Sequence, residues 1–160
     1  WSIMRAESLF RKEARSPVGA LGLMQVMPQT GSKMAQLIGD KNFQAADLLT
    51  PLTAVRIGGS YLQRLSKKFQ GDLVFISASY NAGPHRVRNW LSQFGNLDLD
   101  EFVEHIPFLE TRNYVKKVIS NAAIYHELYS STTDFGLDLA SPIHINPSGP
   151  VPLKETWEEI

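Results

Sequence analysis

The stretch MRAESLFRKEARSPVGALGLMQVMPQT (residues 4–30) begins with a helical pattern that carries a charge on its apolar side. At about 100° per residue, one helix face holds Ile3, Glu7, Phe10 and Ala14. A glutamate in a helix is usually solvated, often beside an i+4 partner such as Arg11, but this spacing predicts that Glu7 is partly removed from water. Loss of water raises the pKa of a carboxyl group, so the position favours a role for Glu7 as a proton donor near neutral pH.

The residues after this helix indicate a loop at a ligand site. Gly19 and Gly22 allow a loop backbone to approach a ligand closely, and Gln25 offers both a donor and an acceptor. Pro28 ends the short apolar segment that follows. The side chain of Met27 fits either this site or ordinary core packing.

Composition excludes several classes of function. The chain has 160 residues, enough for one domain with a substantial core. Its 16 basic and 16 acidic residues give a net charge of zero, so we expect neither nucleic acid nor an anionic membrane as a partner. The absence of cysteine excludes a thiol nucleophile, a cysteine-ligated metal and a disulfide.

The chain contains no recognisable membrane or targeting segment. No run approaches the roughly 18 apolar residues of a membrane span, and no signal peptide is visible. Because residue 1 is a tryptophan inside a periodic segment, we expect the chain to be part of a longer protein with possible additional domains.

Helical signals dominate residues 1–129, which predicts an all-α domain. In residues 50–69, Thr50 can cap a helix and Pro51 suits its first turn. The apolar positions at helical spacing there are Leu52, Val55, Leu62, Leu65 and Phe69. The pair Gly58-Gly59 lowers helix propensity, so it predicts close packing or a bend.

Two further helices follow the same pattern of a cap and then periodicity. Asp72 can cap residues 73–80, whose unbroken apolar start also fits a short buried strand; we favour a helix because no strand-like partner lies nearby. Pro84 begins another helical segment. In residues 110–129, one face holds Tyr114, Val118, Ala122 and Tyr125.

Residues 130–160 differ from the rest of the chain. They contain four of the nine prolines and little periodicity, which predicts an extended tail or linker. Residues that could pack this tail onto the domain are Phe135, Leu137, Ile143 and Trp157.

Several of these stretches together resemble the catalytic domain of the soluble lytic murein transglycosylases, a lysozyme-like family that cleaves bacterial peptidoglycan. The motifs, in order, are AES (6–8), SPVGALGLMQVMPQT (16–30), SYNAGPHRVRNWL (79–91) and FVEHIPFLETRNYV (102–115). The resemblance covers about residues 3–129 and implies packed helices around a groove for a glycan strand. It also implies a catalytic domain over 1–129, shortened at its N-terminus, with 130–160 outside it.

The resemblance also assigns roles to single residues. Glu7 corresponds to the family's catalytic acid and base. The implied substrate-binding residues are Ser16, Gln25, Met27, Tyr80, Asn81, Glu110 and Tyr114. Glu104 is equally typical of the family but fits a structural role as well. Candidates for contacts with an anionic glycan are Arg5, Arg11, Arg15, Arg86 and Arg88, each of which is more often ordinary surface.

The implied reaction cleaves the β-1,4 bond between N-acetylmuramic acid and N-acetylglucosamine and forms a 1,6-anhydro sugar, without metal or cofactor. Glycosidases usually need two carboxylates. The loop after Glu7 holds no acid before Asp40, apart from Glu13 on what we expect to be the same helix, and this favours a mechanism with one carboxylate.

Three alternatives stay open: hydrolysis on the same fold, as in goose-type lysozymes, a non-catalytic peptidoglycan-binding module, and a helical interaction domain. The substrate implies a periplasmic or cell-envelope location.

Overall fold

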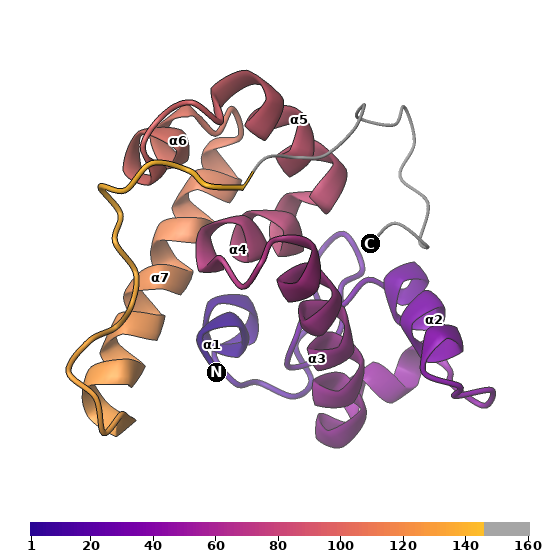
Figure 1. Cartoon of the computed structure of the whole chain (residues 1–160). Coiled ribbons are helices and arrows are strands. Elements are labelled where there is room, and N and C mark those ends of the chain that lie inside the picture. The colour runs from indigo at the N-terminus through magenta and orange to yellow at the C-terminus, as the bar shows by residue number, and fades with distance from the viewer. Residues whose placement is uncertain (146–160) are drawn as a thin grey trace. The chain divides into compact units, whose positions relative to one another are not determined.

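The computed structural model describes residues 1–145 and contains two compact units, residues 1–64 and residues from 65 onward, each described by itself (Figure 1). The first unit holds α1 (Ser2–Ser8), α2 (Pro28–Leu37), the 3₁₀ helix η1 (Ala45–Leu49) and most of α3 (Pro51–Lys68). The second holds α4 (Leu73–Ala82), α5 (Pro84–Phe94), α6 (Leu99–His105) and α7 (Leu109–Tyr129). Apart from three isolated β-bridges, the described residues form no strand, which confirms the all-α prediction.

Helix α1 ends earlier than its sequence pattern predicts. Leu9, with φ 53°, and Phe10, with φ 62°, both take the left-handed conformation directly after Ser8. The prediction that Phe10 and Ala14 share a helix face with Glu7 is therefore wrong, because these residues lie in a loop. Phe10 is 45% exposed, whereas Glu7 is half-buried near the end of the helix.

A tight turn follows this loop in the first unit. Leu21 and Val26 bond each other through both backbone N–H and C=O groups, at 3.1 Å each. Gly22 lies inside this turn with φ 74°, and a Cβ atom there would lie 1.8 Å from the carbonyl oxygen of Leu48. The absence of a Cβ atom at Gly22 therefore permits a close approach to the backbone of η1.

Helix α3 buries only part of the predicted face, since Leu65 and Phe69 are buried as predicted. Leu52 is 79% exposed and Val55 is 45% exposed, so these two predictions are wrong. The buried positions at helical spacing are Ala54, Ile57, Tyr61 and Leu65.

The predicted close packing at the glycine pair occurs at Gly58 alone. A Cβ atom on Gly58 would lie 2.8 Å from Cγ and 2.9 Å from Cβ of Met24, whereas Gly59 faces open space. The absence of a side chain at Gly58 thus lets the turn that carries Met24 pack directly on α3.

Helix α4 is the buried centre of the second unit. The Asp72 carboxylate caps it by accepting the N–H groups of Val74, at 2.8 Å, and Phe75, at 3.3 Å. Burial raises the pKa of Asp72 above its usual value, although these two N–H groups lower it in part. The helix is buried over residues 74–79 and contacts both α5 and α7, which confirms helix over strand for this segment.

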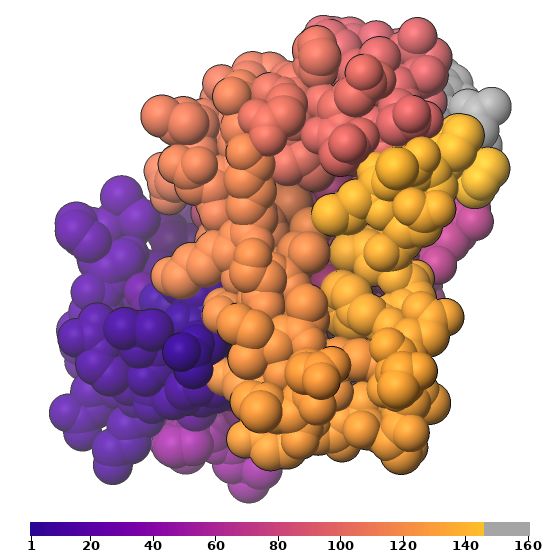
Figure 2. All heavy atoms as spheres, turned by 90° about the vertical axis from the view of Figure 1, so that its left-hand side faces the viewer, coloured from indigo at the N-terminus to yellow at the C-terminus, as the bar shows by residue number. Residues whose placement is uncertain are grey.

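The described part of the tail, residues 130–145, runs back past α7 to the start of α6 (Figures 1 and 2). The carbonyl oxygens of Ser141 and Leu139 accept the N–H groups of Leu99, at 3.1 Å, and Asp100, at 2.9 Å. These are first-turn N–H groups of α6, which have no partner within the helix. Phe135 packs on His126 with ring centroids 5.5 Å apart, and Trp157 lies outside the described residues.

We predict opposite effects for alanine at the two adjacent glycines of α3. Gly58→Ala overfills the contact with Met24 and should lower the free energy of unfolding by about 1–3 kcal/mol. Gly59→Ala meets open space and should raise it by up to about 1 kcal/mol, because alanine favours a helix. Urea denaturation measures both variants, and an equal effect at the two positions would contradict the packing described.

Candidate active site

Glu7 and Gln25 line one pocket of about 800 Å³ in the first unit, here called the Glu7 pocket. The other lining residues are Phe10, Arg11, Lys12, Glu13, Ala14 and Arg15. The pocket is thus made by the end of α1, by residues 10–15 of the loop that follows, and by the turn that holds Gln25. We call residues 9–15 the basic loop, because they carry three cations and one carboxylate.

Gln25 holds the basic loop in place. With φ 46°, the Gln25 backbone takes a left-handed conformation. Nε2 of Gln25 donates to the carbonyl oxygens of Ala14, at 3.1 Å, and Gly22, at 2.9 Å. The N–H of Gly22 also donates to Ala14 at 2.9 Å, so two donors fix the end of the loop.

Ser8 fixes the other end of the same region. Its side chain is buried, and its Oγ lies 2.9 Å from the carbonyl oxygen of Leu23 and 3.2 Å from that of Met4. The bond to Leu23 ties the last residue of α1 to the turn that carries Gln25. Sequence reasoning did not single out Ser8, although a serine next to a candidate acid is a signal that could have found it.

Ser16 and Met27 lie in the same unit but do not line the Glu7 pocket. Ser16 closes a turn: its Oγ accepts the N–H of Ala20 at 2.9 Å, and its own N–H donates to the carbonyl of Ala20 at 3.0 Å. Met27 is the residue before α2 and is 41% exposed, so its side chain does not serve as core.

Glu13 is the main departure from the predicted site. We expected it on the same helix as Glu7, but α1 ends at Ser8 and Glu13 lies in the basic loop. There it lines the same pocket as Glu7, which therefore contains two carboxylates. Lys12 also lines it, although sequence reasoning named only the neighbouring arginines.

In the second unit, Asn81 joins two helices. It lies near the end of α4, and its Oδ1 accepts the Thr111 hydroxyl at 2.6 Å. Thr111 lies in the first turn of α7 and is 2% exposed, so this bond is sheltered from water. Thr111 was missed because nothing in its sequence context separates it from a helix-starting threonine.

The remaining predicted residues lie on the same two helices. Tyr80 precedes Asn81 on α4 and is half-buried. Glu110 lies in the first turn of α7 and is exposed, and the half-buried Tyr114 follows one turn later. The Asn81–Thr111 bond thus holds the segment of α7 that carries Glu110 against α4.

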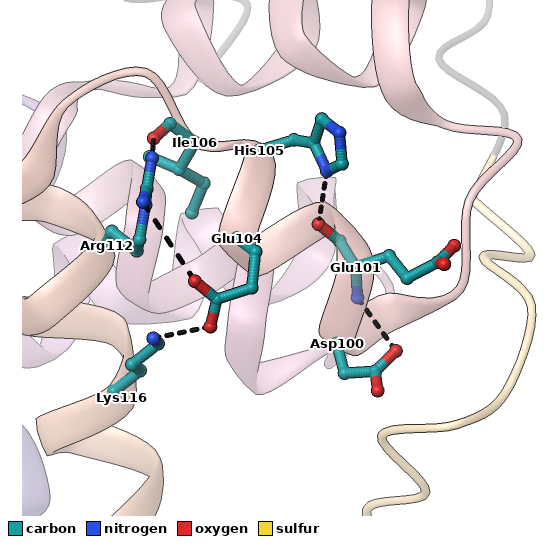
Figure 3. A network of polar contacts seen from close by, with 7 residues as sticks. All are labelled: Asp100, Glu101, Glu104, His105, Ile106, Arg112 and Lys116. Carbon is teal, nitrogen blue, oxygen red and sulfur yellow. Dashed lines mark hydrogen bonds and ion pairs between the residues drawn. The ribbon is translucent and has the colours of Figure 1, made fainter.

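Glu104 is part of a structural ion-pair network (Figure 3). Its Oε1 lies 2.5 Å from Nζ of Lys116, and its Oε2 lies 4.0 Å from Nη1 of Arg112. The same guanidinium donates to the carbonyl of Ile106, at 2.8 Å from Nη2 and 3.3 Å from Nε. The hydrogen bond from Lys116 holds the pKa of Glu104 below its usual value, with further help from the charges of Lys116 and Arg112.

These contacts connect the end of α6 to α7, so Glu104 has a clear structural role. Within residues 1–145, no three histidine, aspartate or glutamate side chains are grouped as a metal site would need. No helix in that range is both long and apolar enough for a membrane crossing.

Comparison with known proteins gives consistent matches. A family model described as "Transglycosylase SLT domain" matches residues 1–103, and one described as "Soluble lytic transglycosylase helical domain" matches residues 105–133. The soluble lytic murein transglycosylase of Salmonella typhimurium is 45% identical over 126 residues, which cover 78% of this chain. The match covers 20% of that protein, so the chain spans about a fifth of the length of this relative.

Two solved structures are similar as well. The 70 kDa soluble lytic transglycosylase of Escherichia coli has a TM-score of 0.77 and 43% identity, over 79% of this chain and 21% of that one. An inactive variant of the lytic transglycosylase Slt from Pseudomonas aeruginosa, with a glutamate changed to glutamine, has a TM-score of 0.75 and 43% identity over the same shares. The lysozyme-like all-α fold is thereby confirmed.

The Glu104 network predicts a loss of stability in acid. Because the folded-state pKa of Glu104 is lowered, its contribution is present above the unfolded value of 4.5 and is lost as the pH falls through the folded value. Glu104→Gln should therefore be less stable than the unmodified chain at pH 7, and the difference should disappear in acid. The side chain is 57% exposed, so we expect a small effect.

Urea denaturation over a pH series measures this difference. Glu101→Gln, at another exposed glutamate of α6, is the matched control. A difference for Glu104→Gln that stays constant with pH would rule out the ion pairs as its cause.

The Asn81–Thr111 bond predicts coupled losses. Thr111→Val and Asn81→Ala should each lower the free energy of unfolding by about 1–2 kcal/mol, since each leaves a partner without its hydrogen bond. The double variant should lose less than the sum, with a coupling energy of about 1 kcal/mol. Denaturation of all four proteins gives this energy directly, and strictly additive losses would mean that the bond contributes nothing.

Proposed function

Because the chain belongs to the transglycosylase SLT domain family, whose model matches residues 1–103, we propose that it is the catalytic part of a peptidoglycan lytic transglycosylase. It would cleave the β-1,4 bond between N-acetylmuramic acid and N-acetylglucosamine and leave a 1,6-anhydro-N-acetylmuramic acid end. The observation that carries this proposal is the position of Glu7. A half-buried carboxyl group near the end of α1 faces an open pocket large enough for a sugar residue.

In this mechanism Glu7 acts twice. Its carboxyl group first donates a proton to the glycosidic oxygen, so that the bond from this oxygen to C1 of N-acetylmuramic acid breaks. The acetamido oxygen of the same sugar stabilises the positive charge at C1. The Glu7 carboxylate then takes the proton of the C6 hydroxyl while the C6 oxygen attacks C1. The ring closes and Glu7 is protonated again, with no water consumed.

The inactive Pseudomonas aeruginosa variant supports a mechanism that requires a glutamate carboxyl group, because a glutamate-to-glutamine change accompanies its loss of activity. A specific observation favours the alternative, which is hydrolysis on the same fold. Glu13 lines the pocket together with Glu7, and paired carboxylates serve hydrolytic glycosidases as acid and base. The two functions therefore differ in what they require of Glu13.

The other predicted site residues take supporting roles in this proposal. Gln25 contributes by fixing the wall of the Glu7 pocket, since its Nε2 donates to the backbone carbonyls of Ala14 and Gly22. Ser16 and Met27 are proposed to contact the glycan strand from the loops that follow. The proposed contacts in the second unit are those of Tyr80, Asn81, Glu110 and Tyr114.

The proposed substrate places the protein at the cell envelope, where peptidoglycan lies, and the periplasm is the location that we propose. We also propose that residues 1–129 form the catalytic body, and that the tail closes the start of α6. The match covers 20% of the Salmonella typhimurium relative, which is consistent with further domains in a longer parent protein.

Substitution of the two pocket glutamates tests the reaction. Glu7→Gln should lower the rate of peptidoglycan cleavage by about 10²–10⁴-fold, because the amide can neither donate nor accept the transferred proton. Glu13→Gln should cleave at close to the unmodified rate and give the same anhydro ends. Mass spectrometry of the released muropeptides identifies the ends, and circular dichroism checks that both variants fold.

Each failure has a separate meaning. Full activity of Glu7→Gln would reject the role of Glu7. Reducing ends from the unmodified chain, together with loss of activity in Glu13→Gln, would replace the lyase with the two-carboxylate hydrolase. Binding of peptidoglycan without any cleavage would leave only a binding module.

A further inference from the structure

The basic loop presents more positive charge to the Glu7 pocket than proton transfer requires. Arg11, Lys12 and Arg15 all line the pocket, and all three are exposed. The loop contains one carboxylate, that of Glu13, so it carries an excess of two positive charges. The whole chain has a net charge of zero, which makes this excess a local feature.

The loop backbone is anchored at both ends, which keeps the positions that carry these side chains beside the pocket. At its start, Nε of Arg11 and the backbone N–H of Arg11 donate to the carbonyl of Ser8, at 3.2 and 3.1 Å. At its end, Gln25 and Gly22 both donate to the carbonyl of Ala14. Between these anchors the chain turns through residues 11–14, where the N–H of Ala14 donates to the carbonyl of Arg11 at 3.2 Å.

The cations have donors available for a ligand. Within residues 1–145, neither Lys12 nor Arg15 forms an ion pair. Arg11 uses Nε on the Ser8 carbonyl, and the two terminal nitrogens of its guanidinium carry further N–H donors. An ammonium and two guanidinium groups around one pocket are suited to carboxylates, which accept charge-assisted hydrogen bonds from them.

We propose that the basic loop is a carboxylate-recognition site that selects muramic acid residues carrying an anionic substituent. This inference rests on the proposed function and deepens it, because it names a part of the substrate that the pocket binds in addition to the scissile bond. N-acetylmuramic acid differs from N-acetylglucosamine by its lactyl group. That group supplies a carboxylate when it is free, or carries a peptide with carboxylates of its own. The positive loop therefore separates an anionic murein strand from a neutral chitin-like strand.

Binding of three probes tests the proposal. The probes are peptide-free glycan strands with free lactyl carboxylates, peptide-bearing strands, and the neutral hexamer of N-acetylglucosamine. The test variant is Lys12→Gln with Arg15→Gln, which leaves Arg11 and its bond to Ser8 intact. The matched control is Lys33→Gln with Lys67→Gln, which removes the same charge from exposed positions outside the pocket. All are made with Glu7→Gln, so that the strands stay uncut during calorimetric titration.

The test variant should bind at least one anionic probe roughly three- to thirtyfold more weakly, while the neutral hexamer and the control variant change little. A loss confined to peptide-free strands identifies the lactyl carboxylate as the ligand, and a loss confined to peptide-bearing strands identifies the peptide. Equal losses for all three probes, equal losses in the control variant, or no loss at all would overturn the proposal.

A parallel digestion separates this inference from the proposed function. The unmodified chain is incubated with peptidoglycan and its products are analysed for anhydro ends. Charge-dependent binding without cleavage would reject the lyase reaction and leave the recognition site standing. Cleavage that yields anhydro ends, together with binding that does not depend on charge, would support the lyase reaction and reject the recognition site.

Discussion

The abrupt end of α1 is the constraint on which the candidate site depends. Two consecutive residues with side chains, Leu9 and Phe10, take the left-handed conformation, which costs each of them roughly 1–2 kcal/mol. A helix continued past Ser8 would carry residues 9–14 away along its axis, and no loop would close beside Glu7. Contacts on both sides hold this backbone path: the Ser8 hydroxyl donates to Leu23, and Gln25 donates to the carbonyl of Ala14. Unfavourable conformations that are held by surrounding bonds are typical of functional sites.

The polar contacts beside Glu7 and those beside Asn81 are of two kinds. Beside Glu7, the side chains of Ser8 and Gln25 donate to backbone carbonyls. The loop is thus held through its backbone, and the loop's own charged side chains stay available for ligands. In the second kind, one side chain binds another in a sheltered place, where Asn81 accepts from Thr111. A bond of that kind fixes the alignment of α4 and α7, because a shift along either helix would leave both partners unsatisfied. The exposed network around Glu104 adds a weaker connection between α6 and α7.

The predictable features were those set by local chemistry. Asp72 has the geometry of a capping residue in its own sequence context, and an apolar run of the length of residues 73–80 needs a buried position, so α4 could be predicted. The end of α1 could not, because neither leucine nor phenylalanine signals a left-handed backbone. Because the predicted helix ran past Ser8, Glu13 was also wrongly placed on it. On α3, periodicity identified the buried Leu65 and Phe69, whereas Leu52 and Val55 are exposed. The packing of Met24 at Gly58 joins segments distant in sequence, which periodicity cannot show. The roles of the predicted site residues stay predictions, since they depend on the substrate.

The backbone hydrogen bonds between the tail and α6 limit how far the chain can be truncated at its C-terminal end without a loss of contacts. Leu139 and Ser141 accept the first-turn amides of α6, which leaves those amides protected from exchange with solvent hydrogen for as long as the tail stays in place. A chain cut after Tyr129 would keep every described helix. The N–H groups of Leu99 and Asp100, however, would then have only water as a hydrogen-bond partner. The tail thus adds backbone hydrogen bonds to α6 that the helices alone do not provide. A protein engineer who trims the chain at the end of α7 should find α6 as the first segment to fray.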